Sequence, residues 1–344
     1  MHREPSRAVV VTGAAGWLGQ NLVRALAADK RDVVRCLVQS ESEGALLEVV
    51  SPTVQPVVGD VRDPAAIERL FDGVGSATVF HAAGVIHPPG TTRPFFDVNV
   101  GGTQQVLDGA RRAGAGRFVH VSSNSPFGAN DRPTGRFTED SPYHPYLSYG
   151  RSKMEGEQLV LQAHRRGDLE TTVLRPPWFY GPHQPARQDQ FFAAIRKNRF
   201  PMIGDGTQQR SMCFTGNLVQ GCLRAETAEA APGQAYWIAD AEPYELREIF
   251  DGVRAALQAE GLDVKAGRGP RLPLKAADVA VRLDSLLQAA GRYVQPLHVL
   301  GELRDTIACD IAKARKDLGY EPEVALVEGM RASIRSCLAR GARL

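Results

Sequence analysis

A turn of three spaced glycines near the N-terminus constrains the fold more than any other feature of the chain. A short β-branched run at residues 8–11 ends at Thr12-Gly13, and apolar residues then recur at helical spacing over Trp17–Ala28. Gly13, Gly16 and Gly19 lie between them in a G-x-x-G-x-x-G pattern. These glycines would permit the tight turn, the close approach of a pyrophosphate and the packing of helix on strand. The helix N-terminus would offer free N–H groups to the phosphates. The pattern predicts a dinucleotide-binding strand–turn–helix unit.

The same alternation of strand and helix continues through the first half of the chain. Further strands are predicted at residues 32–38, 54–58, 77–82, 117–122 and 171–174, with helices at 64–71, 99–113 and 149–164. Strands that alternate with helices imply right-handed crossovers. The predicted fold class is therefore α/β, a Rossmann doubly wound parallel sheet.

A second, smaller lobe is predicted after Arg175, where prolines and longer irregular stretches begin. A helix at 215–228 and a strand at 235–238 return to the sheet, whereas helices at 244–261 and 272–290 lie outside it. A short helix at 311–318 closes the chain. The expected division is a dinucleotide-binding domain of residues 1–175 plus about 212–240, and a discontinuous substrate-binding lobe of about 176–211 plus 241–344.

Charge and composition exclude several classes of protein. The 344 residues carry a formal net charge of +2, so no basic excess is available for nucleic acid. No apolar stretch is long enough for a membrane span, and the N-terminus lacks a secretory pattern, so a cytoplasmic protein without membrane partners is expected. Five cysteines without a C-x-x-C pair fit neither a disulfide framework nor zinc, and the histidine spacing implies no catalytic metal.

Tyr149 and Lys153 are the strongest catalytic candidates. Four residues apart at the start of a predicted helix, they share one face. A phenol with a pKa of about 10 is a poor acid or base at neutral pH. A nearby ammonium stabilises the phenolate and lowers that pKa. Tyr149 could then move the proton of a hydroxyl whose carbon exchanges a hydride with a nicotinamide.

Ser123 completes the candidate catalytic group. It follows the predicted strand at residues 117–122 and lies 26 residues before Tyr149. A hydroxyl at the carboxyl end of a central strand can hydrogen-bond the reacting oxygen and hold it against the tyrosine.

Taken together, these motifs resemble the extended short-chain dehydrogenase/reductase superfamily over nearly the whole chain. The residues that carry the resemblance are Thr12 to Gly19, Phe80 to Gly84, Asn99, Ser123, Tyr149, Lys153, Leu174-Arg175-Pro176, Tyr180-Gly181-Pro182 and Lys313 to Tyr320. The resemblance implies an NAD(P)-dependent enzyme whose catalytic residues are Ser123, Tyr149 and Lys153. It also implies a small-molecule substrate, and it leaves undecided whether the protein forms a homodimer.

The resemblance places the cofactor on residues from several turns. They are Gly13, Gly16, Trp17, Leu18, Gly19, Gln39, Ser40, Asp60, Val61, Ala82, Ala83, Gly84, Tyr149, Lys153 and Pro176. The choice between NAD and NADP stays open, with a slight preference for NADP, because Val38 stands where NAD sites usually have an acid and no arginine replaces it. Gln39 and Ser40 suit a hydroxyl or a phosphate. Asp60 would lie near the adenine, or alternatively start the helix before Pro64.

The residues after Ser123 narrow the reaction. Family members that dehydrate or decarboxylate nucleotide sugars carry acidic residues close behind this hydroxyl, whereas this chain has Asn124-Ser125. Oxidation, reduction and epimerisation through a transient ketone need only the serine, tyrosine and lysine. The sequence therefore favours these three reactions.

The substrate residues leave two hypotheses open. The segment from Gly204 to Met212 resembles the one in nucleotide-sugar epimerases where an arginine binds the substrate diphosphate. Arg210 suits that role because guanidinium binds phosphate through paired donors, and the alternative is a surface arginine after a glycine turn. Pro176-Pro177 and Asn217 instead resemble the 3β-hydroxysteroid dehydrogenase branch, which acts on apolar alcohols and ketones. The remaining substrate-binding candidates are His87, Asn124 and Phe179. A third hypothesis is a dinucleotide-sensing regulator without catalysis, which would not need the tyrosine.

Overall fold

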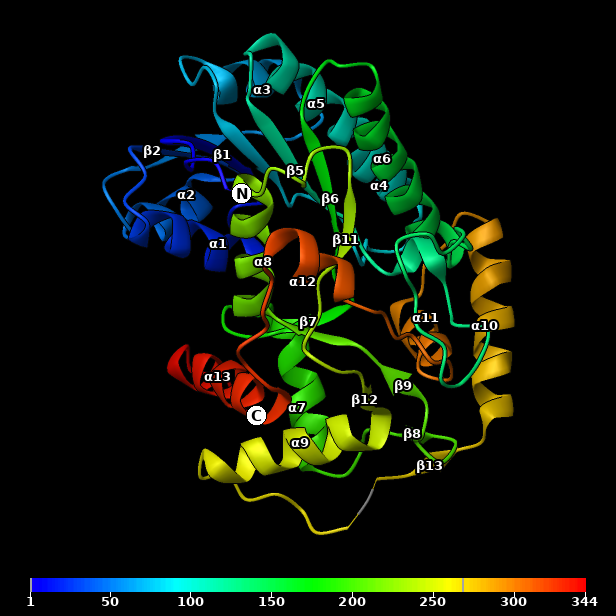
Figure 1. Cartoon of the computed structure of the whole chain (residues 1–344). Helices are drawn as coiled ribbons and strands as arrows, with labels where there is room; N and C mark the ends of the chain where they lie inside the picture. Colours follow the sequence, from blue (N-terminus) through cyan, green and yellow to red (C-terminus); the bar gives the residue numbers. More distant parts are fainter. Residues whose placement is uncertain (1, 268) are drawn as a thin grey trace.

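A seven-stranded parallel sheet forms the centre of the molecule (Figure 1). The structure, a computed structural model, describes residues 2–267 and 269–344. The strand order is β11-β6-β5-β4-β1-β2-β3. The strands are β1 (Ala8–Thr12), β2 (Val33–Val38), β3 (Val54–Val58), β4 (Thr78–His81), β5 (Arg117–Val121), β6 (Thr171–Arg175) and β11 (Ala235–Trp237). The predicted Rossmann fold class is confirmed.

The strand order explains where a ligand can bind. β1 pairs with β2 on one side and with β4 on the other, so the chain reverses direction across the sheet at β1. A crevice opens outside the carboxyl ends of the strands at such a switch point. The glycine turn follows β1 directly and therefore lies at this crevice.

Two layers of helices bury the sheet on both faces (Figure 1). One layer contains α1 (Trp17–Ala28), α8 (Thr215–Thr227) and α12 (Ala312–Leu318), and the other contains α3 (Pro64–Phe71), α5 (Thr103–Arg112) and α6 (Leu147–Arg165). α2 (Glu41–Glu48) connects β2 to β3. A short helix, α4 (Arg93–Phe96), continues into a π-helical turn, η1 (Asp97–Gly102), which leads into α5.

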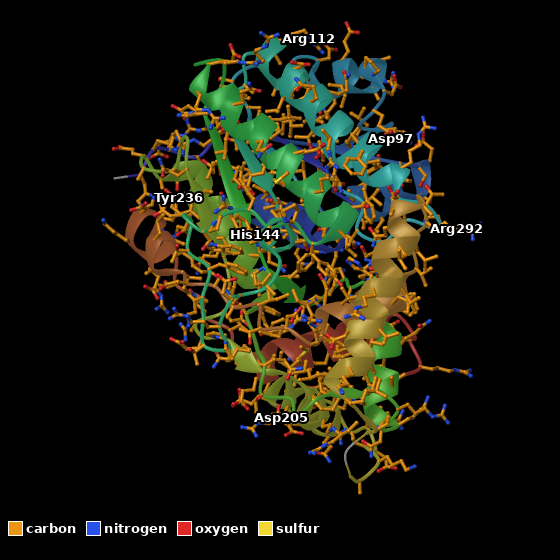
Figure 2. The ribbon with its side chains drawn as sticks, turned by 90° about the vertical axis from the view of Figure 1, so that its right-hand side faces the viewer. Asp97, Arg112, His144, Asp205, Tyr236 and Arg292 are labelled. Atoms are coloured by element: carbon orange, nitrogen blue, oxygen red, sulfur yellow. The ribbon has the colours of Figure 1, made fainter. Side chains whose placement is uncertain are left out.

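The second lobe has an apolar core of its own beneath the sheet (Figure 1). Its helices are α7 (Asp189–Arg196), α9 (Leu246–Ala259), α10 (Leu274–Ala289), α11 (Gln295–Glu302) and α13 (Leu326–Ala339). Its short strands are β7 (Trp178–Tyr180), β8 (Met202–Ile203), β9 (Gln209–Arg210), β10 (Met212–Phe214), β12 (Tyr244–Glu245) and β13 (Arg271–Leu272). α10 runs along the outer edge of the lobe (Figures 1 and 2).

The structure adds helices that the sequence pattern did not predict, namely α2, α4, α7, α11 and α13, and the short strands β7, β8, β9, β10, β12 and β13. Around α12, Ile311, Leu318 and Tyr320 pack in the same apolar cluster as Trp237 of β11. The exact domain limits remain a prediction. Among the described residues, no helix is both long and apolar enough to cross a membrane.

Candidate active site

The glycine turn is built so closely that side chains would not fit. Gly13 has φ +69°, and a Cβ there would lie 2.7 Å from the backbone nitrogen of Ala83. A Cβ on Gly19 would lie 2.1 Å from the carbonyl oxygen of Gly13. Gly16 begins α1 without a side-chain cap, which leaves the first N–H groups of the helix for a ligand. The turn therefore fits a pyrophosphate at the positive end of the helix.

Two residues predicted to bind different ligands lie against each other. The rings of Trp17 and Phe179 pack with centroids 4.8 Å apart, and Trp17 Nε1 donates to the carbonyl oxygen of Gly181 at 3.2 Å. Leu18, next along α1, is buried in the core. The pair joins the glycine turn to the segment that leads into the second lobe.

The first turn of α2, just after β2, contains a carboxylate that the sequence pattern did not single out. Glu43 Oε2 accepts a hydrogen bond from the backbone N–H of Gln39 at 2.7 Å, and Ser40 Oγ accepts one from the backbone N–H of Glu43 at 3.3 Å. Val38, at the usual acidic position, is buried. The Ser40-x-x-Glu43 spacing at a helix start, a capping pattern, was the available signal.

Asp60 and Val61 follow β3 at the same edge of the sheet. Asp60 Oδ2 accepts from Arg62 Nη2 at 2.6 Å, and this bond is the main cause that lowers the pKa of Asp60. Asp63, rather than Asp60, caps α3. Val61 is buried against Gly102. The alternative role of Asp60 as the helix-starting residue is therefore wrong.

Tyr149 lies near the start of α6 in a nearly closed apolar setting. Its ring packs on Phe95 with centroids 5.7 Å apart, and both belong to one apolar cluster. Burial raises the pKa of Tyr149 to about 12, while the Ser123 hydroxyl acts in the opposite direction. Leu147, two residues earlier, has φ +52°, a conformation that L-residues rarely adopt. Ser123 and Tyr149 are thus brought together as the sequence predicts.

Lys153 lies one helical turn after Tyr149 and is buried. Its Nζ donates to the carbonyl oxygen of Val121 at 2.8 Å. Burial lowers the pKa of Lys153 to about 8, and the charge of Glu157 partly offsets this. Gly84 runs beside the ammonium, since a Cβ there would lie 3.9 Å from Nζ. The cation therefore stands at the carboxyl edge of the sheet, next to a backbone stretch predicted to hold cofactor.

Asn99 holds that backbone stretch in place from the π-helical turn. Its Oδ1 accepts from the N–H of Val85 at 2.7 Å, and its Nδ2 donates to the carbonyl oxygen of Val85 at 3.0 Å. Nδ2 also donates to Ser152 Oγ at 3.0 Å, which connects the loop to α6. π-helical turns are frequent at functional sites. Ala82 and Ala83, half-buried before Gly84, and buried Pro176 line the same edge.

Tyr293 of the second lobe, which the sequence pattern did not reveal, belongs to the same apolar cluster as Tyr149. Its Oη lies 2.6 Å from His87 Nδ1, and its ring meets Phe95 edge-on at 5.3 Å. The N–H of Tyr293 also donates to the carbonyl oxygen of Gly90 at 3.2 Å. Burial lowers the pKa of His87 to about 4, so this imidazole is neutral at pH 7. His87 is therefore held by a partner 206 residues away, and its role as a substrate-binding residue stays a prediction.

Arg210 is buried inside the second lobe. Its Nη2 donates to the carbonyl oxygen of Glu302 at the end of α11. Its Nε is also buried and has no hydrogen-bond partner among the described residues. Arg210 is therefore not a surface arginine. Asn124, half-buried, starts the turn after Ser123, where its carbonyl oxygen accepts from Phe127 N at 2.9 Å.

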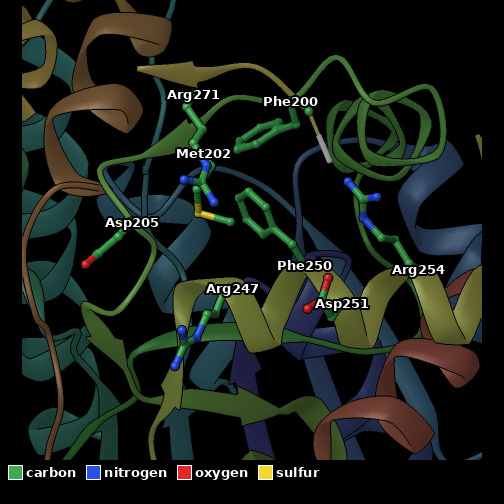
Figure 3. Close-up of a pocket in the computed structure, with 9 residues that line it drawn as sticks. Phe200, Met202, Asp205, Arg247, Phe250, Asp251, Arg254 and Arg271 are labelled. Atoms are coloured by element: carbon green, nitrogen blue, oxygen red, sulfur yellow. The ribbon is translucent and has the colours of Figure 1, made fainter. Parts of the chain in front are cut away.

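Neither of two hollows in the structure is lined by Ser123, Tyr149 or Lys153. One lies in the second lobe beside α9 (Figure 3). At about 20 Å³ it has room for about one water molecule. The other, about 300 Å³, lies along residues 129–144. Within the part of the chain that is described, no group of three His, Cys, Asp or Glu side chains is placed to hold a metal ion, and all five cysteines are buried and unpaired.

A phosphate-fitting turn at the switch point of a parallel sheet, with a buried tyrosine and lysine beside it, defines a dinucleotide-dependent enzyme of the Rossmann class. The chain belongs to the NAD dependent epimerase/dehydratase family, whose sequence model matches residues 9–239. The expected membership in the extended short-chain dehydrogenase/reductases is thereby confirmed, and the chain is an enzyme of the oxidoreductase or epimerase type.

Several relatives cover nearly the whole chain. An uncharacterized protein, y4nL, of Sinorhizobium fredii is 41% identical over 97% of this chain and 96% of its own. The 4-hydroxy-2-methyl-3-oxo-4-farnesyl-3,4-dihydroquinoline-1-oxide ketoreductase of Stigmatella aurantiaca is 34% identical over 94% of both chains. A 3 beta-hydroxysteroid dehydrogenase/Delta 5-->4-isomerase of Mycobacterium tuberculosis is 30% identical over 91% of this chain and 86% of its own.

Solved structures share the fold at lower identity. UDP-glucuronic acid 4-epimerase from Bacillus cereus, in complex with NAD, superposes with a TM-score of 0.76 at 22% identity, covering 97% of this chain and 99% of the epimerase. At this identity the likeness establishes the fold alone.

Proposed function

We propose that this protein is an NAD(P)-dependent ketoreductase that interconverts a ketone and a secondary alcohol on Ser123, Tyr149 and Lys153. The observation that carries the proposal is the buried Tyr149 phenol, influenced by the Ser123 hydroxyl and one helical turn from the Lys153 ammonium. Neither residue after Ser123 is an acid or base, so this group offers proton transfer without elimination.

Each residue has one task in this proposal. The Ser123 hydroxyl donates a hydrogen bond to the ketone oxygen and holds it against Tyr149. The Tyr149 Oη gives its proton to that oxygen in reduction and takes it back in oxidation. The Lys153 cation favours the phenolate left behind. When bound, the nicotinamide supplies or accepts the hydride at the carbonyl carbon.

The surroundings of Tyr149 favour an apolar ketone over a nucleotide sugar. Phe95 and Tyr293 pack around the catalytic ring, and Arg210, the candidate diphosphate ligand, donates to the carbonyl oxygen of Glu302 instead. The names of two relatives at 30% identity or above describe a ketoreductase of a farnesylated quinoline and a steroid dehydrogenase. Both substrates are largely apolar, which supports the same assignment.

Glu43 favours NAD as the cofactor, against the slight preference for NADP drawn from the sequence. A carboxylate just after β2 can accept a hydrogen bond from a ribose 2′-hydroxyl. It would repel a 2′-phosphate and already accepts from the N–H of Gln39 that such a phosphate would need. We therefore assign NAD specificity to a residue of α2 rather than to the strand end.

A nucleotide-sugar epimerase is the second candidate because one donor of Arg210 is free. Nε is buried without a partner among the described residues and suits a phosphate oxygen. In an epimerase, Arg210→Ala would weaken substrate binding and leave cofactor binding unchanged. In a reductase of apolar ketones, the same variant would change substrate affinity little.

The absorbance of the reduced nicotinamide separates these candidates. Purified protein is given a panel of apolar ketones, and separately nucleotide sugars, with NADH or NADPH. A ketoreductase oxidises the cofactor in proportion to product. An epimerase forms product without net change in absorbance, and a dinucleotide-sensing regulator forms none. Product with no cofactor consumption would refute the proposal.

A further inference from the structure

The helix α10 is buried on one face and carries exposed apolar side chains on the opposite face. Its inner face is buried by packing of Ala277, Ala280 and Gln288 against the rest of the protein. Val279, Leu283 and Leu286 follow an i, i+4, i+7 spacing that places them on the opposite face. They are 55%, 46% and 69% exposed. These three residues are called the α10 apolar stripe.

Exposed large apolar side chains are concentrated on and near α10 rather than scattered over the surface. Nine large apolar side chains are exposed among the described residues, and five of them lie on α10 or within five residues of its end: the three stripe residues, Leu274 and Val294. The other four lie on or beside α2 and α13. Single exposed apolar residues are normal, whereas a contiguous group marks an interaction surface. Since α10 forms the outer edge of the lobe, nothing in the described chain covers it (Figures 1 and 2).

The charges along the stripe are positive. Lys275 and Arg282 are exposed. Lys275 lies four residues before Val279 and Arg282 four residues before Leu286, so each borders the apolar side chains. Exposed Arg271 and Arg292 stand near the two ends, and Arg292 is labelled in Figure 2. None of these four forms an ion pair with another described residue.

The two acidic side chains of α10 are both engaged. Asp278 pairs with Arg304, and buried Asp284 accepts from His298 at 2.9 Å and from Gln288 at 3.0 Å. The face that α10 presents to solvent therefore combines apolar side chains with unneutralised cations.

We infer that the α10 apolar stripe docks the protein on an anionic lipid surface. A helix with apolar side chains on one face and lysine or arginine beside them binds in the interface of a membrane, held by apolar burial and by attraction to anionic lipids. With 16 residues, α10 is about 24 Å long and lies on the surface rather than crossing it. A second copy of this chain fits less well, because a two-fold contact through the stripe brings Lys275 and Arg282 of both copies together.

Docking through α10 would bring the membrane close to the candidate active site. The inner face of α10 contacts the start of α6, where Gln288 Oε1 accepts from the N–H of Ser148 at 3.1 Å. Ser148 immediately precedes Tyr149. An apolar ketone dissolved in the lipid would then reach the site without crossing water. The docking itself does not depend on the proposed reaction.

Vesicle sedimentation tests the docking without substrate. The full-length protein is spun with vesicles of phosphatidylcholine alone or mixed with phosphatidylglycerol. We expect binding to the anionic vesicles that weakens with added salt. Leu283→Gln with Leu286→Gln should lower the partition coefficient about tenfold or more. Lys275→Glu with Arg282→Glu should remove the preference for phosphatidylglycerol.

The matched control is Val49→Gln, which removes an apolar side chain that is 81% exposed and outside the stripe. It should leave vesicle binding unchanged. Circular dichroism and thermal melts establish that each variant is folded. Absence of wild-type binding, or equal binding by the Leu283/Leu286 variant, would overturn the inference. A wild-type dimer in sedimentation velocity that this variant dissociates would assign the stripe to contact between copies instead.

Discussion

At the scale of single residues, the proposed role of Tyr149 places two opposing requirements on its phenol. The phenol must be shielded from water to direct one proton, yet burial raises its pKa to about 12. Such a group keeps its proton at pH 7 and so is poised as an acid for ketone reduction. Oxidation requires the phenolate, which the Lys153 cation must favour.

Tyr149→Phe should lower kcat by about a hundredfold or more, the usual contribution of a positioned acid–base group. Cofactor affinity, measured by quenching of tryptophan fluorescence, should stay within about twofold because only the hydroxyl is removed. Tyr146→Phe, at the residue before α6, is the matched control and should keep most activity. Retention of more than about a tenth of kcat by Tyr149→Phe would refute the assigned role.

The buried Lys153 makes stability depend on pH. Its pKa is about 8 in the folded protein, below the ordinary value of 10.5. Between these values the unfolded chain binds more protons, so the free energy of unfolding rises with pH, by up to about 3 kcal/mol. Below about pH 8 the lysine is protonated in both the folded and the unfolded protein, so this group no longer makes the free energy of unfolding rise with pH. Lys153→Met should lack the rise. Urea unfolding of both proteins across this range measures it, and parallel pH profiles would contradict it.

Glu43 is predicted to decide between the two dinucleotides. Glu43→Gln should tighten NADP binding about tenfold by removing a negative charge near the 2′-phosphate, and should weaken NAD binding slightly. Isothermal titration calorimetry measures both affinities without turnover. Glu41→Gln, which alters an exposed neighbouring carboxylate, should change neither. Wild-type protein that binds NADP as tightly as NAD would exclude the assignment.

At the scale of elements, α6 is fixed to the sheet by a buried ion pair. The Glu157 carboxylate forms an ion pair with Arg175 of β6. It also accepts hydrogen bonds from Ser122 Oγ at 2.8 Å and from Tyr143 Oη at 2.6 Å. The guanidinium of Arg175 also lies 4.5 Å from the centre of the Phe127 ring. These contacts hold the helix that carries Tyr149 and Lys153 against the strand ends.

Arg175→Met should therefore destabilise the fold by about 3–5 kcal/mol, because it leaves the Glu157 charge buried and unpaired. The double variant with Glu157→Leu should recover part of that loss, since both charges are then gone. Urea unfolding of the three proteins gives the coupling between the two sites. A double variant less stable than Arg175→Met would contradict this account.

The elements that the sequence predicts are those with strong local signals. The β-branched run before Gly13 and the helical spacing after Trp17 lie within one short segment, so the first unit follows from pattern alone. α7 and α13 were missed because no such strand–turn signal precedes them in the second lobe. The contact of His87 with Tyr293 spans 206 residues, and such tertiary pairing leaves no local pattern.

At the scale of the whole molecule, the candidate active site lies where the central sheet meets the second lobe. The glycine turn and Tyr149 belong to the dinucleotide-binding domain, and Tyr293 belongs to the second lobe. Two backbone hydrogen bonds connect the two parts of the molecule: the N–H of Tyr293 donates to the carbonyl oxygen of Gly90, and the N–H of Thr92 donates to that of Gly291. The sequence analysis predicts two lobes and a catalytic group of Ser123, Tyr149 and Lys153, and both stay predictions. It did not predict this closure, because the closure depends on how the lobes pack.

The proposed ketone reduction requires that a hydride pass from the added cofactor to the carbonyl carbon of the substrate at this junction. The most direct test uses NADH deuterated at the nicotinamide C4 position with a ketone that the protein reduces, followed by mass spectrometry of the alcohol. We predict one deuterium at the carbinol carbon with wild-type protein and no labelled product above background with Tyr149→Phe. Product that forms without deuterium from the added cofactor would contradict the account.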